Sequence, residues 1–218
     1  MDAQALKRLN EMGYSDLTGF DIERGINDDC IEHLVDHPIN GCFAGRDRNC
    51  RQSFWKGIAY VLTKRDGNAE TLASLVDYTY QEIAPCCMGV YENRLGGRIC
   101  VAGYYPWENL QNLSKSSQIK ALMRWLSKDS LPAYVDSFHR INLWVREPEK
   151  GKLIVALTNS YLDPAIELRL RLSTDREEIS IFDMDCSETK VKADITDGVY
   201  KQFIIPEIEP WQMILILA

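Results

Sequence analysis

The stretch Ile166-Glu167-Leu168-Arg169-Leu170-Arg171-Leu172 alternates apolar and charged residues. Because successive side chains of a β-strand point to opposite faces, this pattern predicts a strand with one dry face and one solvated face. Short apolar runs separated by turn residues recur around it over about 80 residues, which is typical of an antiparallel β-sandwich. Trp144 and Trp211 lie in or beside these runs, so we expect them in the core. The expected strands are 138–145, 153–158, 166–172, 179–182, 199–205 and 213–217.

The preceding half of the chain has a different composition. Residues 1–127 hold eleven of the thirteen Gly and six of the seven Cys. We therefore predict two domains, an α/β domain over 1–127 and a small C-terminal β-sandwich over 128–218. Apolar spacing and turn residues predict helices at 3–12 and 114–126, a short helix at about 28–37, strands at 58–63, 86–92 and 98–103, and, for the ambiguous run 69–78, a helix in preference to a strand.

Charge and composition exclude several partners. The chain has 25 Lys and Arg against 32 Asp and Glu, so its net charge is −7. A surface of that sign repels nucleic-acid phosphates and anionic lipids. No apolar run reaches the roughly 18 residues of a membrane helix, and the charges of Asp2, Lys7 and Arg8 leave no room for the apolar core of a secretory signal. We therefore expect a cytoplasmic protein with no nucleic-acid or membrane partner.

Motifs for catalysis and for metal or cofactor binding are absent from the sequence. There is no nucleophile elbow, phosphate loop, dinucleotide fingerprint or zinc-protease motif. His33 and His37 could face one metal ion if they lay on a helix, but further ligands are missing, so we favour surface and turn roles. The paired carboxylates of glycosidases come from distant strands and cannot be recognised by spacing. We predict no catalytic residue, metal ligand or cofactor.

Four aromatic residues are the candidate carbohydrate-binding residues: Trp55, Tyr104, Tyr105 and Trp107. The last three follow a predicted strand directly, in a loop that Pro106 restricts, and Trp55 lies beside an arginine-rich stretch. Flat rings held on rigid loops can stack on sugar faces. The alternative is that the rings close a core or an interface, which we favour for Tyr104 and Trp107.

Several short motifs resemble a family of carbohydrate-active proteins. The runs Asp36-His37-Pro38-Ile39-Asn40-Gly41 and Glu92–Tyr104 resemble the later part of the glutamine-amidotransferase-like domain found behind the catalytic barrel in some glycoside hydrolases, of which the trimerisation domain of certain β-galactosidases is the best known. Residues 153–211 are similar to the small β-sandwich that follows it. The resemblance implies a truncated mixed α/β domain, amidotransferase-like or flavodoxin-like, followed by an antiparallel β-sandwich.

The resemblance also implies a function. In the family this domain has lost its catalytic triad and serves assembly, while the hydrolytic acids lie on a barrel of about 250 residues that cannot fit here. We therefore expect a non-catalytic accessory or oligomerisation module of a glycoside-hydrolase-like protein. The alternatives are a stand-alone carbohydrate-binding protein and a glycosidase with an unrecognised acidic pair. Because the first βα units of the domain are missing, an open sheet edge is expected, and with it a homo-oligomer, most simply a dimer centred on the first domain.

Overall fold

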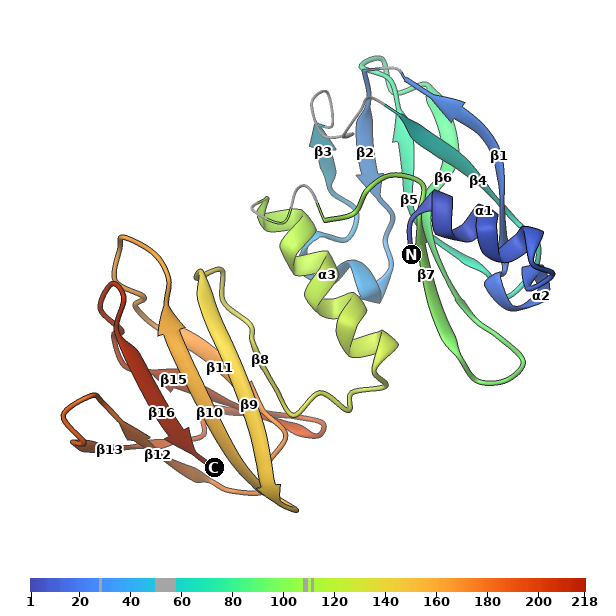
Figure 1. Cartoon of the computed structure of the whole chain (residues 1–218). Helices are drawn as coiled ribbons and strands as arrows, with labels where there is room; N and C mark the ends of the chain where they lie inside the picture. The colour runs from blue at the N-terminus through green and yellow to red at the C-terminus, as the bar shows by residue number, and fades with distance from the viewer. Residues whose placement is uncertain (28, 50–57, 108–109, 111) are drawn as a thin grey trace. The chain divides into compact units, whose positions relative to one another are not determined.

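The computed structural model describes residues 1–27, 29–49, 58–107, 110 and 112–218. The chain divides into two compact units, Met1–Lys128 and Asp129–Ala218 (Figure 1). Both units are rich in β-structure, and the pairings between their named strands are antiparallel. The fold is therefore α+β, with few helices.

The first unit contains two sheets. The larger has the strand order β3-β2-β5-β6-β7, and the smaller pairs β1 with β4. The strands are β1 (Phe20–Ile26), β2 (Ile31–Leu34), β3 (Asp47–Asn49), β4 (Ala59–Lys64), β5 (Glu70–Val76), β6 (Glu82–Glu92) and β7 (Arg98–Ala102). The helices are α1 (Ala3–Glu11), α2 (Ser15–Thr18), the 3-10 helix η1 (Pro38–Phe43) and α3 (Leu113–Leu126).

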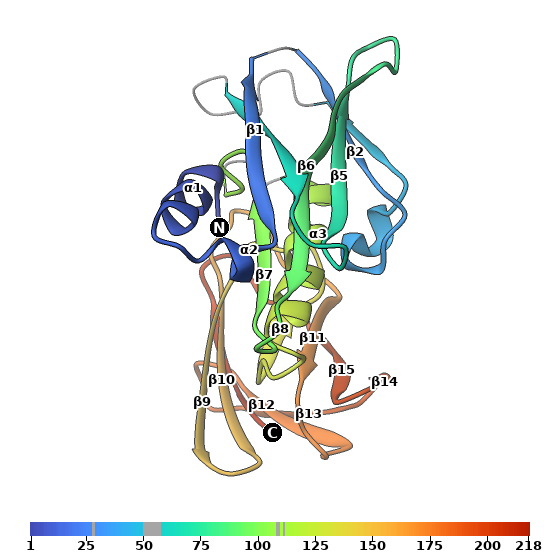
Figure 2. The same cartoon turned by 90° about the vertical axis from the view of Figure 1, so that its right-hand side faces the viewer.

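The larger sheet separates two cores. On one face Cys86 packs in a cluster with Leu6 of α1, and on the other Cys87 packs in a cluster with Leu122 of α3. Figure 2 shows α3 behind β6 and β7. The two neighbouring cysteines point to opposite faces of β6, as the period of a strand requires.

One glycine joins the two sheets. The Gly103 carbonyl accepts a hydrogen bond from the Tyr60 amide of β4 at 2.8 Å, and the Gly103 amide donates to the Cys87 carbonyl of β6 at 2.7 Å. A Cβ atom at this position would lie 2.1 Å from the Tyr60 carbonyl oxygen. Only glycine allows this approach of two backbones.

The topology of the first unit is not the flavodoxin-like one that the sequence led us to expect. That architecture has a parallel sheet, whereas the named strands of the described first unit pair antiparallel; the parallel contact is a single bridge between Asp2 and Ala102.

The helices predicted at 28–37 and 69–78 are also wrong. The acids at 28 and 29 suit a helix N-terminus, but the segment that follows is strand β2, in which the alternate residues Glu32 and Leu34 are buried. Strand β5 lies within the second range, because its apolar run fits helical spacing as well as a strand.

The start of the chain lies along β7. The Met1 ammonium donates to the Cys100 carbonyl at 2.7 Å, and the Ala102 amide donates to the Met1 carbonyl at 2.9 Å. These bonds satisfy part of the hydrogen-bonding edge that β7 presents.

The second unit pairs a five-stranded sheet, β13-β12-β16-β10-β9, with a four-stranded sheet, β14-β15-β11-β8. Residues from both sheets form one core, which gives the expected sandwich-like arrangement. The strands are β8 (Ala133–Val135), β9 (Ile141–Glu149), β10 (Lys152–Asn159), β11 (Leu168–Leu172), β12 (Glu178–Phe182), β13 (Glu188–Lys192), β14 (Ile195–Asp197), β15 (Tyr200–Ile205) and β16 (Met213–Leu217).

The alternating stretch behaves as predicted in β11. Leu168, Leu170 and Leu172 are fully buried, while Arg169 is exposed and Arg171 is half-buried. Arg171 lies 3.1 Å from Asp136 and 3.3 Å from Asp197, so the outer face of the four-stranded sheet carries ion pairs.

The two tryptophans of this unit contradict the expectation of core positions. Trp144 is 56% exposed and Trp211 is 67% exposed. Trp144 lies on edge strand β9 and points outward, because the alternate residues Leu143 and Val145 pack against the core.

Candidate functional site

The structure separates the four aromatic candidates. Tyr105 and Trp107 are about half exposed, and Trp55 lies outside the described residues. Tyr104 is only 3% exposed, so its ring cannot meet a sugar from solvent. The sugar-binding interpretation is corrected for Tyr104, which has the alternative role of a core residue.

Tyr104 belongs to a buried polar cluster built around Glu32. The Glu32 carboxylate accepts hydrogen bonds from Arg48 Nε at 2.7 Å, from Lys115 Nζ at 3.1 Å and from the Tyr104 hydroxyl. Lys115 also donates to Gln118 Oε1 at 2.6 Å. Glu32 is completely buried, and the other members are at most 4% exposed.

Three secondary-structure elements, and the loop after β7 that holds Tyr104, assemble this cluster. Glu32 and Arg48 are direct cross-strand partners on β2 and β3, and Lys115 is supplied by α3. The Gln118 amide extends the network by donating to Asn40 Oδ1 at 2.7 Å. Asn40 in turn donates to the Val35 and Leu72 carbonyls, so the network anchors η1 and α3 to the sheet.

The electrostatics of the cluster keep Glu32 ionised. Burial alone raises the pKa of this carboxyl, but the charges of Lys115 and Arg48 and the hydrogen bonds from Tyr104 and Arg48 outweigh burial and lower the pKa to about 2. Burial and the nearby Glu32 charge raise the pKa of the Tyr104 hydroxyl well above its usual value. At neutral pH Glu32 is therefore ionised and the Tyr104 phenol is protonated.

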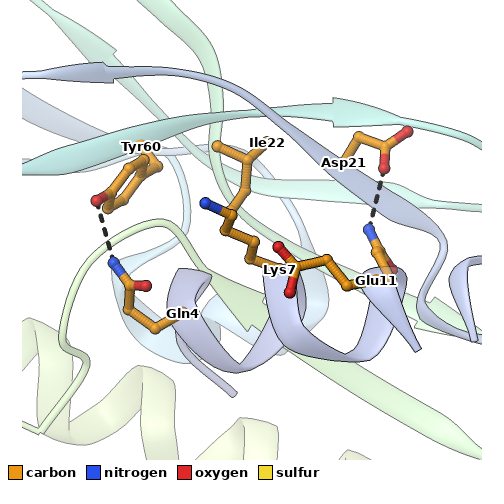
Figure 3. A pocket seen from close by; sticks show the side chains of 7 residues that line it. Gln4, Lys7, Glu11, Asp21, Ile22 and Tyr60 are labelled. Atoms are coloured by element: carbon orange, nitrogen blue, oxygen red, sulfur yellow. Dashed lines mark hydrogen bonds between the residues drawn. The ribbon is translucent and has the colours of Figure 1, made fainter.

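A second polar arrangement faces solvent in the first unit. A groove of about 400 Å³ lies between α1 and the β1–β4 ribbon (Figure 3). The lining residues are Gln4, Lys7, Asn10 and Glu11 of α1, Asp21 and Ile22 of β1, and Tyr60 of β4.

Hydrogen bonds across the groove fix its walls. Gln4 Nε2 donates to the Tyr60 hydroxyl at 3.1 Å, and Asn10 Nδ2 donates to Asp21 Oδ1 at 3.0 Å (Figure 3). Between these bonds lie the Lys7 ammonium and the apolar side chain of Ile22. Amide, hydroxyl, carboxylate and ammonium groups beside an aromatic ring form a surface that can bind a polyhydroxylated ligand.

The two histidines do not come together as metal ligands. His33 Nδ1 lies 2.7 Å from Asp47, and His37 Nε2 lies 3.1 Å from Glu70. His37 Nδ1 also accepts a hydrogen bond from the Ile39 amide at the start of η1. Throughout the described ranges, no group of three or more His, Cys, Asp or Glu side chains is arranged to hold a metal ion.

Sequence reasoning missed the Glu32 cluster, although one signal was present. Lys115 and Gln118 share the helical spacing of the apolar residues Ile119 and Leu122. Two polar side chains on the buried face of a helix require hydrogen-bonding partners in the core. The sequence does not show which acidic residue is the partner of Lys115.

No protein-family model matches the chain, and no curated protein matches it. None of the helices in the part of the chain that the structure describes is long and apolar enough to cross a membrane.

Proposed function

We propose that this chain is a non-catalytic accessory module of a glycoside-hydrolase-like protein and serves architecture and assembly. The observation that carries the proposal is the environment of Glu32. The pKa of this carboxylate is lowered to about 2, and the group is sealed in the core and held by three partners.

The chemistry of sugar hydrolysis requires the opposite environment. Two carboxylates must face the sugar about 5 to 10 Å apart, and the one that acts as the acid needs a raised pKa. The Glu32 pKa is lowered, and no substrate can reach its oxygens. The other described carboxyls with a shifted pKa, Asp77 and Glu92, are also lowered, in both cases by hydrogen bonds from neighbouring residues.

A hydrolysis assay tests this proposal. We expect no turnover of a panel of nitrophenyl glycosides by the purified chain. Turnover that survives a second purification and disappears when a single Asp or Glu is changed to its amide would overturn the proposal in favour of a glycosidase.

The groove beside α1 favours carbohydrate binding as a second candidate function, because its donors and acceptors flank the Tyr60 ring. Calorimetric titration with neutral oligosaccharides tests it. Binding that is lost in Lys7→Ala and Tyr60→Ala but kept in Tyr105→Ala and Trp107→Ala would assign the sugar to the groove. The reverse result would assign it to the loop that contains Tyr105 and Trp107, and no binding by the unmodified chain would exclude this function.

A further inference from the structure

One end of the groove beside α1 is closed by hydrogen bonds within the chain. Both Asp21 oxygens are occupied, since Oδ1 accepts from Asn10 Nδ2 at 3.0 Å and Oδ2 accepts from Arg65 Nε. The Asn10 amide is also occupied at both of its polar atoms. Its nitrogen donates to the Phe20 carbonyl as well as to Asp21, and its oxygen accepts from the Thr18 hydroxyl at 2.7 Å. These groups are engaged in holding the groove in shape.

The Lys7 ammonium, by contrast, forms neither a hydrogen bond nor an ion pair with any residue in the part of the chain that the structure describes. It projects between Tyr60 and Ile22 in Figure 3. The other charged residue of α1 that lines the groove, Glu11, lies 3.6 Å from Arg8, which is not a lining residue. The groove therefore offers a positive charge to a ligand.

The Tyr60 ring beside this charge is held in place at three points. Its hydroxyl accepts from Gln4 Nε2 at 3.1 Å, and its amide donates to the Gly103 carbonyl at 2.8 Å. The ring also lies across Gly25, its partner on β1, where a Cβ atom would approach Tyr60 Cε1 to 3.6 Å. A wall fixed in this way binds a ligand with little loss of side-chain entropy. Because the hydroxyl accepts from Gln4, its own proton remains available for a further acceptor.

The donors that remain in the groove determine the chemistry of its ligand. They are the N–H bonds of the Lys7 ammonium and the O–H bond of Tyr60. A carboxylate accepts several such bonds at once, and a hydrogen bond to an ionised group is roughly twice as strong as a neutral one. A phosphate dianion suits the groove less well. Its second charge would find no second cation among the described lining residues and would lie in a groove that also holds Glu11 and Asp21.

Acceptors and apolar atoms in the groove indicate what carries the carboxylate. Gln4 Oε1 and the Glu11 carboxylate can accept from hydroxyl groups. Tyr60 and Ile22 present an aromatic ring and an apolar side chain. A pyranose ring has both hydroxyl groups and an apolar face, whereas a simple aliphatic carboxylate would leave these acceptors unused. The groove volume of about 400 Å³ lies within the range of small-ligand sites, about 300 to 1,000 Å³.

We propose that the groove binds a hexuronic acid, with the sugar carboxylate on the Lys7 ammonium and the Tyr60 hydroxyl. This inference rests on carbohydrate binding by the groove, the second candidate function above, and names the class of sugar. The net charge of −7 is compatible with it, because exposed charges more than about 8 Å away are largely screened at physiological salt. Lys7 is exposed, so we expect weak binding that added salt opposes.

Calorimetric titration of the full chain with two disaccharides of the same linkage tests the proposal. The probes are digalacturonic acid and its neutral counterpart, digalactose. At low salt we expect the uronate to bind about tenfold more tightly, which is the order of one charge-assisted hydrogen bond. The preference should shrink in about 1 M salt, where the Debye length is only about 3 Å.

Three variants locate the carboxylate. Lys7→Met keeps an apolar side chain of similar length but removes the charge, so it should abolish the preference for the uronate. Lys7→Arg keeps the charge and should retain the preference. Lys150→Met, the same change on an exposed lysine of the second unit, should leave the preference unaltered. Circular dichroism would verify that the variants are folded.

Equal affinities for the two disaccharides, or a preference that survives Lys7→Met, would overturn the uronate assignment and leave sugar binding by the groove in place. Acetate that competes as well as the uronate at equal concentration would also overturn it, because the sugar ring would then contribute nothing. The absence of binding by either disaccharide would exclude carbohydrate binding itself, and with it this inference. None of these outcomes bears on hydrolysis, which the glycoside assay tests separately.

Discussion

The Lys115 ammonium lies 3.1 Å from the Glu32 carboxylate, although 83 residues separate them in the chain. This contact joins α3 to β2 inside the core. Both side chains are almost completely buried. Removal of either one leaves the other charge in the protein interior with fewer opposite charges around it, where it is poorly solvated.

Loss of Lys115 should therefore destabilise the first unit strongly. We expect Lys115→Met to lower the free energy of unfolding by about 3 to 5 kcal/mol, the usual cost of breaking a buried ion pair. Lys128→Met is the matched control, because Lys128 forms an exposed pair with Glu92 at 3.6 Å, and its loss should cost at most about 1 kcal/mol. Urea unfolding measures both values. Equal effects of the two changes would contradict the structural role of the cluster.

The Glu32 carboxyl should make stability depend on pH in the acid range. Its pKa is about 2 in the folded chain, against 4.5 for the ordinary group. The stabilisation is therefore complete above pH 4.5 and is lost as the pH falls towards 2. The shift corresponds to about 3 kcal/mol. The difference in unfolding free energy between the unmodified chain and Glu32→Gln should shrink between pH 6 and pH 3, and a constant difference would refute this assignment.

Substitution of Gly103 should disturb the joint between the two sheets. A Cβ atom there would meet two backbone carbonyl oxygens, those of Tyr60 and Cys87, at 2.1 and 3.0 Å. We expect Gly103→Ala to cost at least about 2 kcal/mol, because backbone must move to make room. Gly67→Ala is the control, since no atom lies within 4 Å of its Cβ position. An equal change of the thermal unfolding temperature in both variants would contradict the close approach of the Tyr60 and Cys87 carbonyl oxygens to Gly103.

The thiols should fall into two classes of reactivity. Cys42 and Cys186 are exposed, whereas Cys30, Cys86, Cys87 and Cys100 are buried. Burial raises the pKa of Cys100 to about 12 and that of Cys87 well above the ordinary thiol value. In a Cys50→Ser background, which removes the cysteine outside the described residues, a thiol reagent at pH 8 should label two sites quickly and four more only after unfolding. Rapid labelling of more than two sites in the folded chain would contradict the burial of the core.

The sequence predicted the second unit more accurately than the first. The strands expected at 153–158, 179–182 and 213–217 match β10, β12 and β16 closely, because alternation and turn residues mark a sheet with one dry face. In the first unit, β5 contains Leu72, Ala73 and Leu75, which are all fully buried in one core. An apolar run without alternation has no period that distinguishes a strand from a helix.

The candidate sites were predictable only in part. Tyr104 turns inward to Glu32, as the favoured core role predicted. Trp107, for which a core or interface role was also favoured, is 47% exposed and is therefore not a core residue. The partner of a buried charge depends on tertiary contacts between distant segments, as the separation of Glu32 from Lys115 shows. The groove beside α1 likewise requires β1, a strand that the sequence pattern did not reveal.

Gly103 has a consequence for the dynamics of the first unit. The Gly103 amide is bonded to β6 of the larger sheet, and its carbonyl is bonded to β4 of the smaller sheet. The β1–β4 pair therefore cannot separate from the larger sheet without breaking a hydrogen bond to Gly103. The amide protons of Tyr60 and Gly103 should therefore exchange with solvent at similar rates, through one shared opening event. The two sheets of this unit would then unfold as a single cooperative block.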